Sequence, residues 1–162
     1  MQLYLKYKLL TSSTVLNEDQ EVVYNIRPEL TFFHHKFRLL DEDNNVVYVI
    51  QNKLFRLFKT YSIKDAEGNE LYTVRNRLSF FIKRNKIKNK NPEDAGNGYK
   101  LTGSVMGWHF TLKCNGEEIC TVKKTELIKF TDRYLINIQD ESKVNLCVAI
   151  ALIIDAIYHR KS

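Results

Sequence analysis

A dense group of cations in the middle of the chain offers the clearest chemistry in the sequence. Lys83, Arg84, Lys86, Lys88 and Lys90 all lie within "KRNKIKNK" (83–90). Ammonium and guanidinium groups at this density attract phosphates and carboxylates, and each cation near an anionic membrane contributes about 1 kcal/mol of binding. The segment therefore predicts an electrostatic site for anionic lipid headgroups or for an acidic partner.

The charge of the whole chain supports this location. Residues 1–50 carry a net charge of −2, residues 51–100 carry +7, and residues 101–162 carry +1. Arg75 and Arg77, one predicted strand away, extend the predicted site. A solvated hairpin end whose lysines discourage edge-to-edge strand pairing is the alternative interpretation. Nucleic acid would respond to the same charge, but only Phe80 and Phe81 offer stacking platforms nearby, so nucleic acid is not the expected partner.

Residues that could support catalysis do not form a recognisable pattern. The histidines stand without metal-ligand spacing around them: His34, His35, His109 and His159. No GxSxG, Walker A or dinucleotide-binding fingerprint is present. Asp155 is a single carboxylate in an apolar segment, where it needs a partner such as an arginine or a place at the mouth of the fold. We therefore predict no enzyme, no cofactor and no metal site.

The three cysteines, Cys114, Cys120 and Cys147, form no CxxC motif. An odd number of thiols without such a motif is typical of a reducing compartment, and "MQLYLKYKLLTSS" (1–13) lacks the apolar core of a signal peptide. We expect a cytoplasmic protein. Cys114 and Cys120 are predicted to be core residues that could also face each other across a turn at 115–116 as a weak redox pair.

A repeat of 24 residues organises the first half of the chain. It aligns "VVYNIRPELTFF" (22–33), "VVYVIQNKLFRLF" (46–58) and "ELYTVRNRLSFFI" (70–82), with Tyr24, Tyr48 and Tyr72 in register. Alternating apolar residues flank turns such as "DEDNN" and "DAEGN", which is the pattern of a β-hairpin. A meander of equal hairpins without duplication would give a similar period. Both interpretations predict successive hairpins of one sheet or barrel.

The rest of the chain continues with strands until its last segment. Residues 99–114 resemble one strand with a bend at Gly103 and Gly107, and residues 123–140 resemble two strands around a turn at 131–132. Turn spacing then predicts about ten to twelve strands followed by one helix.

The C-terminal segment "KVNLCVAIALIIDAIYHRKS" (143–162) predicts a helix with Ser142 as its N-cap. Its unbroken apolar run, 146–154, is nine residues long, whereas a membrane-spanning helix needs about 20 apolar residues. Because the helix is apolar almost all round, we expect it to be buried. A β-barrel wrapped around the helix is the simplest way to bury it among strands.

These hairpins, a later "FTLKCNG" (110–116) and the closing "DRYLINI" (132–138) are similar to the LURP-one-related family, as a small bacterial-type member. That family is grouped with the Tubby C-terminal-like proteins and the phospholipid scramblases. The residues that carry the resemblance are Tyr61, Ile63, Asp65, Gly68, Tyr72, Val74, Arg75, Phe110, Leu112, Gly116, Tyr134, Ile136, Ile138 and the segment 148–155. The resemblance implies a closed antiparallel barrel of about twelve strands around a buried C-terminal helix.

Taken together, the patterns predict one domain over residues 1–162 that is mainly β. We expect a non-enzymatic binding or adaptor module, monomeric, that associates peripherally with anionic phospholipid or with an acidic partner. The alternative is a barrel that carries a small hydrophobic ligand. A helix that fills the barrel would leave no cavity for such a ligand, so the two hypotheses make different structural predictions.

Overall fold

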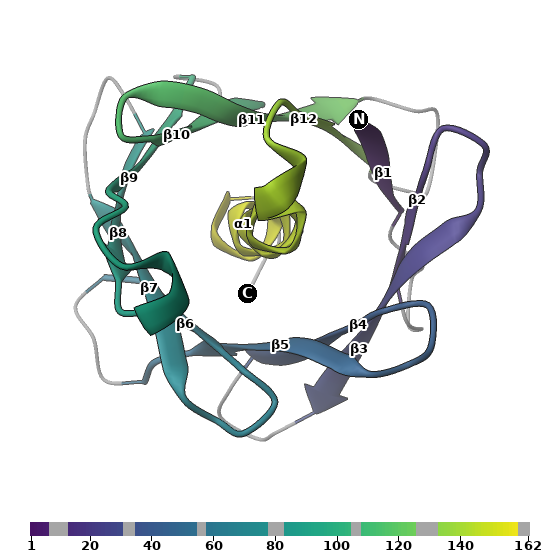
Figure 1. The fold of residues 1–162 in the computed structure, drawn as a ribbon, viewed down its shortest axis with the longest axis horizontal. Helices are drawn as coiled ribbons and strands as arrows, with labels where there is room; N and C mark the ends of the chain where they lie inside the picture. The colour runs from purple at the N-terminus through teal and green to yellow at the C-terminus, as the bar shows by residue number, and fades with distance from the viewer. Residues whose placement is uncertain are drawn as a thin grey trace.

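A computed structural model describes residues 1–6, 13–30, 35–54, 58–77, 83–104, 108–125 and 133–158. These residues form a closed barrel of twelve strands around one α-helix (Figure 1). The strands are β1 (Gln2–Lys6), β2 (Ser13–Leu16), β3 (Val22–Leu30), β4 (His35–Leu40), β5 (Val46–Asn52), β6 (Thr60–Lys64), β7 (Glu70–Arg77), β8 (Lys83–Asn89), β9 (Tyr99–Gly103), β10 (His109–Cys114), β11 (Glu117–Thr125) and β12 (Arg133–Ile138). Two short 3₁₀ helices, η1 (Pro92–Asp94) and η2 (Glu141–Lys143), and the helix α1 (Val144–Tyr158) complete the described fold.

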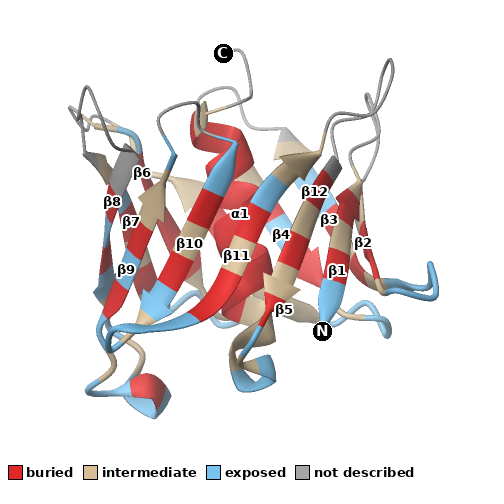
Figure 2. Ribbon diagram, turned by 90° about the horizontal axis from the view of Figure 1, so that it is seen from above, coloured by how far each residue is buried: buried red, intermediate tan, exposed pale blue. Residues whose placement is uncertain are grey.

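Each strand pairs antiparallel with its neighbours in the sequence, and β1 closes the barrel against β12, with Leu3 opposite Ile136. Closure removes the exposed strand edges that would otherwise pair with other chains. Because every connection reverses direction, alternate connections lie at opposite ends of the barrel, and the N-terminus lies at the end opposite to the end of α1 (Figure 2). The predicted fold class, a closed antiparallel barrel of about twelve strands around a C-terminal helix, is confirmed.

The 24-residue period corresponds to a repeated turn. In the turns 17–21, 41–45 and 65–69, the first residue accepts hydrogen bonds through its side chain from the fifth, as in Asn69 N to Asp65 Oδ1 at 2.7 Å. The fourth residue has positive φ in all three copies: Gln20 at 65°, Asn44 at 64° and Gly68 at 91°. Asn, Asp and Gly tolerate this left-handed conformation best, which explains the composition of the predicted turns. The strand register shifts beside each turn.

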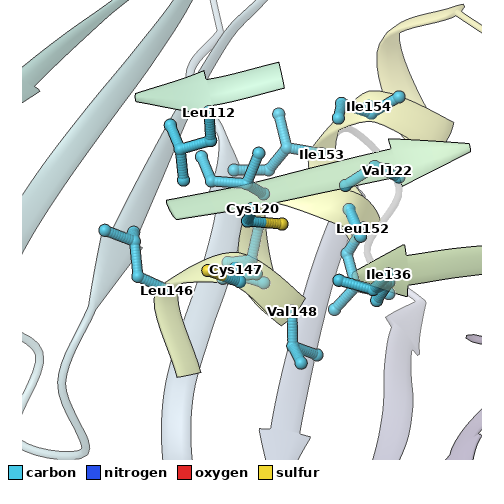
Figure 3. Packing of buried hydrophobic residues seen from close by; sticks show 14 of the residues in the cluster. Leu112, Cys120, Val122, Ile136, Leu146, Cys147, Val148, Leu152, Ile153 and Ile154 are labelled. Atoms are coloured by element: carbon cyan, nitrogen blue, oxygen red, sulfur yellow. The ribbon is translucent and has the colours of Figure 1, made fainter. Parts of the chain in front are cut away.

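The helix α1 occupies the interior of the barrel. All its residues from Leu146 to Ile157 are buried, and the inward residues of the strands pack around them (Figure 3). Burying each large aliphatic side chain contributes about 1.5–3 kcal/mol, so the wall and the helix stabilise each other. The helix and the inward-facing side chains fill the middle of the barrel, so the structure favours no hydrophobic ligand beside the middle of the helix. Among the described residues, no helix has the length and apolarity required to span a membrane.

Polar contacts fix the position of the helix within the barrel. Near its start, Tyr24 Oη donates to Asn145 Oδ1 at 2.7 Å. Farther along, Tyr134 Oη donates to Asp155 Oδ1 at 2.7 Å, so a tyrosine is one partner of the buried carboxylate for which the sequence suggested an arginine. Buried polar groups that are hydrogen-bonded favour one register of packing over its neighbours.

Asp94 connects the loop between β8 and β9 to the segment that precedes the helix. Its carboxylate is 4% exposed and accepts hydrogen bonds from the side chains of Tyr72, Asn89, Asn97, Tyr99 and Lys143. Burial acts to raise the pKa of Asp94, but the donors, led by Lys143, outweigh it and hold the pKa at about 2. This network is the principal ionic connection between the barrel wall and the entrance of the helix among the described residues.

Two local predictions of secondary structure are wrong. Ser142 does not cap α1: the helix begins at Val144, directly after η2, and Asp140 Oδ1 accepts from Ser142 N at 3.1 Å. Residues 99–114 form two strands, β9 and β10, because the chain reverses after Gly103.

Cys114 and Cys120 do not face each other, since the β10–β11 register places Cys114 opposite Glu117 and Cys120 opposite Leu112. Cys120 instead lies beside Cys147 of the helix (Figure 3). A hydrogen bond with Cys147, together with burial, raises the pKa of the Cys120 thiol.

Candidate functional site

A row of four cations crosses four neighbouring strands on the outside of the barrel. Arg75 of β7 lies opposite Lys86 of β8, Lys86 lies opposite Lys100 of β9, and Lys100 lies opposite Lys113 of β10. All four side chains are exposed. We call this row, together with Lys88 of β8, the basic wall.

The cations of the wall face outward because buried and exposed residues alternate along these strands. In β8, Asn85 and Ile87 are buried, whereas Lys86 and Lys88 between and beside them are exposed. The same alternation exposes Lys100 between two buried residues of β9. Side chains of successive residues in a strand point to opposite faces, so each cation of the wall belongs to the solvent face.

Lys86 and Lys100 lie opposite only cations on the neighbouring strands, whereas Lys113 lies opposite the exposed Glu118 of β11. Within the described part of the chain, Lys86, Lys88, Lys100 and Lys113 form no ion pair. Directly opposed residues on neighbouring strands have Cβ atoms about 4.5–5.5 Å apart, and like charges at this spacing destabilise a sheet. A row of four such cations therefore costs stability, and an anionic ligand would offset that cost.

Arg75 is held in place by an aromatic ring. Its guanidinium carbon lies 4.8 Å from the centre of the Phe58 ring, which is the distance of a cation–π contact. The contact orders the side chain at one end of the row while leaving the guanidinium exposed. Lys88 lies opposite Thr73 rather than opposite another cation, so it extends the basic wall along β8 toward the loop at 90–98.

Lys90, also predicted as a site residue, lies outside the row and forms an ion pair. Its ammonium pairs with Glu70, which also pairs with Lys53. Burial acts to raise the pKa of Glu70, but hydrogen bonds from Lys53 and Lys90 outweigh it and hold the pKa at about 2. Lys90 therefore belongs to a local ionic cluster with Glu70 and Lys53.

The remaining predicted site residues are placed by their backbone alone. Arg77 and Arg84 lie opposite each other in β7 and β8, and Lys83 lies opposite Gly103. The side chains of these three residues lie outside the described part of the structure. The prediction that Arg75 and Arg77 lie one strand away from the basic segment is confirmed by the register.

Lys100 and Lys113 were missed by the sequence analysis. Each is a single cation between inward-facing residues, in "YKL" and "LKC", and neither belongs to a cluster along the chain. The alternating pattern indicates that both face outward. Only the register of three strand pairs places them beside Lys86, and that register could not be obtained from composition.

Carboxylates gather at one end of the barrel, where α1 begins. This acidic end consists of the segments 17–21, 41–45, 65–69, 90–98, 115–116 and 139–143. Its carboxylates are Glu18, Asp19, Glu21, Asp41, Glu42, Asp43, Asp65, Glu67, Glu93, Asp94, Asp140 and Glu141. Its two lysines, Lys90 and Lys143, are paired with Glu70 and Asp94. The molecule is thus electrostatically polarised although its net charge is +6.

Other reactive residues do not assemble into a site. His109 lies exposed in β10 and His35 begins β4, while His34 and His159 lie outside the described residues. In the part of the chain that the structure describes, no group of three His, Cys, Asp or Glu side chains is placed to hold a metal ion.

Comparison with known proteins places this geometry in context. A family model described as LURP-one-related matches residues 1–155. An X-ray structure of a protein from Arabidopsis thaliana superposes with a TM-score of 0.60 at 10% sequence identity, and the match covers 95% of this chain and 91% of that one. At that identity the likeness shows the fold alone. A search of curated proteins finds no match.

Proposed function

Since this chain belongs to the LURP-one-related family, whose barrel is a binding scaffold, we propose that it is a non-enzymatic module that binds anionic phospholipid surfaces peripherally through the basic wall. The observation that carries this proposal is the row of exposed, unpaired cations that runs from Arg75 to Lys113 across four strands. A sheet face that presents several cations side by side suits an extended anionic surface better than a single small anion.

Binding to the membrane surface is expected to be weak and reversible at physiological salt. At about 1 kcal/mol for each cation near an anionic surface, the five cations of the wall contribute about 5 kcal/mol. Because the wall is exposed, salt screens this attraction over about 8 Å at physiological ionic strength. Binding is therefore expected to be strong at low salt, to weaken steeply as salt is added, and to require anionic lipid.

The uneven distribution of charge should orient the molecule on a membrane. An anionic membrane attracts the basic wall and repels the acidic end, so we expect the wall to face the lipid and the acidic end to point away from it. Trp108, the single tryptophan of the chain, is 45% exposed at the start of β10, far from the acidic end along that strand. Tryptophan favours the membrane–water interface, so its fluorescence should report the approach of this part of the barrel to lipid.

The test is flotation with vesicles of neutral lipid or of neutral lipid with phosphatidylserine, at low and high salt. The variant Lys86→Ser/Lys100→Ser removes two charges from the centre of the wall, and binding to anionic vesicles should fall about 30-fold, from two contributions of about 1 kcal/mol each. The variant Lys6→Ser/Arg27→Ser is the matched control, because it removes the same charge from β1 and β3.

The outcomes separate the hypotheses. Salt-sensitive binding to anionic vesicles that is lost in the wall variant and kept in the control supports the proposal. Equal losses in both variants would indicate that net charge, not the wall, attracts the lipid. Absence of binding at low salt would reject lipid as the ligand and leave an acidic protein as the anionic partner.

A further inference from the structure

A cavity of about 530 Å³ lies at the acidic end, between the barrel rim and the first turn of α1. It is separate from the basic wall, because its lining comes from Met1, β1, the turn 17–21, β3, the turn 41–45, the start of β5 and the helix. Its volume lies within the range of small-ligand sites. The first two residues of the helix, Val144 and Asn145, form one side of the cavity, and the turn 41–45 forms another.

The floor of the cavity is apolar. Leu3, Val23, Val47 and Val144 line it, and all four belong to or pack against the hydrophobic core. One polar pair interrupts the floor, where Tyr24 donates to the side-chain oxygen of Asn145, the second residue of the helix. A ligand with an aliphatic or other apolar body would bury that body on these side chains.

The rim of the cavity carries more negative than positive charge, because Asp41, Glu42 and Asp43 lie in a turn that only one described guanidinium contacts, that of Arg27, which donates to Asn44 Oδ1. Asp41 uses both carboxylate oxygens to hold its own turn, through the backbone and side-chain nitrogens of Asn45. Glu42 and Asp43 are exposed and form neither an ion pair nor a side-chain hydrogen bond with any described residue. Their carboxylates therefore remain available to a ligand at the rim.

Positive groups near the cavity do not cancel this charge. The Met1 amino group donates to the Ile138 carbonyl and lies 3.7 Å from Glu141. The start of α1 offers about half a positive charge, less than the charge of Glu42 and Asp43 together. Burial raises the pKa of Tyr24 to about 12, and the nearby carboxylates Asp41 and Glu42 add to the rise, consistent with a negative potential inside the cavity.

We propose that this cavity is a binding site for a small organic cation with an apolar body, such as an alkylammonium or alkylguanidinium compound. The cationic group lies at the rim against Glu42 and Asp43, and the apolar body lies on the floor beside Tyr24. This site is independent of the basic wall, so a failure of lipid binding leaves the inference standing, and the reverse also holds.

The experiment is a titration followed by ¹H–¹⁵N NMR of the full chain with hexylammonium, and separately with hexanoate, which has the same alkyl body and the opposite charge. Hexylammonium is expected to shift the amide signals of residues 41–47 and 144–145 in a saturable manner at millimolar concentration. Hexanoate is expected to leave those signals in place. Equal shifts with both probes, or no shift with either, would overturn the assignment.

A pair of variants distinguishes the cavity from the general charge of the acidic end. Glu42→Gln/Asp43→Asn should weaken hexylammonium binding at least about fivefold, as expected for the loss of two exposed charge contacts. Glu67→Gln/Glu93→Gln removes the same charge from the same end but from outside the cavity, and Glu67 holds the position of Asp43 in the next repeated turn. A loss of equal size in the control would also overturn the assignment.

Discussion

Replacing Asp94 by asparagine removes a buried charge while preserving the size of the side chain. In the native protein the carboxylate accepts hydrogen bonds from Tyr72 at 2.9 Å and from Asn97 at 2.6 Å, and it pairs with Lys143. The side-chain oxygen of an asparagine can accept hydrogen bonds from only some of these donors. Its NH₂ group would point at the remaining donors, and the Lys143 ammonium cannot accept a hydrogen bond from it. We expect the variant Asp94→Asn to fold but to lose about 2 kcal/mol of unfolding free energy at pH 7.

The same contacts predict a pH dependence. The pKa of Asp94 is about 2 in the folded protein against 3.8 for the ordinary side chain. Because the folded pKa is depressed, the stabilisation is present above about pH 4 and is lost as the pH falls toward 2. The difference corresponds to about 2 kcal/mol at 1.36 kcal/mol per pKa unit, and to about 1–2 kcal/mol after allowance for solvent near the barrel end.

Urea unfolding followed by far-ultraviolet circular dichroism at pH 7, 5, 4 and 3 measures both effects. The wild type should lose stability steeply below pH 4, and the Asp94→Asn variant should start lower and lose less over the same interval. Glu93→Gln, a change at the exposed neighbour in η1, should keep the wild-type stability and acid response. If Asp94→Asn matched the wild type at pH 7, or fell equally steeply in acid, the assigned role of this carboxylate would be wrong.

Two further predictions concern the interior. Cys114 is half-buried and should react with a thiol reagent in the folded protein, whereas Cys120 and Cys147 are fully buried and should react only after unfolding. Three fast-reacting thiols in the native protein would contradict the packing in Figure 3. Gly103→Ala should destabilise the barrel by about 1–3 kcal/mol in the same urea assay, since the added methyl carbon would clash with the buried ring of Phe110. A neutral result would show that this ring can move aside.

The main features of the fold could be predicted because they depend on patterns of residues that are close together in the sequence. Alternation of buried and exposed residues specifies strands wherever one face is buried, and the turn at 65–69 contains the aspartate and glycine that its backbone requires. The helix was predictable because its apolar run is too short for a membrane and too uniform for a surface. The two strands within 99–114 were not separated, because Gly103 and Gly107 were interpreted as a bend within one strand and not as the ends of a reversal.

The candidate site was only partly predictable, because a sheet surface is assembled across strands. Lys86 and Lys88 were found since they lie in one dense segment. Lys90 lies in the same segment but pairs with Glu70, a partner 20 residues earlier in the sequence. Lys100 joins the site from the next strand. Charge density along the chain therefore located the right strand, and the register of the barrel decided which cations act together.

The repeated turns show how one position in the fold can differ in function from its copies. The turns 17–21, 41–45 and 65–69 share the same hydrogen bonds and the same positive φ, so their backbones are nearly equivalent. Their surroundings differ because α1 lies within the barrel as a single element that cannot repeat with them. In the copy at 41–45, the third turn residue, Asp43, lines a cavity above the helix start, whereas Glu67 in the next copy does not. The cavity therefore takes three residues of the turn 41–45, one residue of the turn 17–21 and none of the turn 65–69, and this asymmetry makes Glu67 a useful control for Asp43.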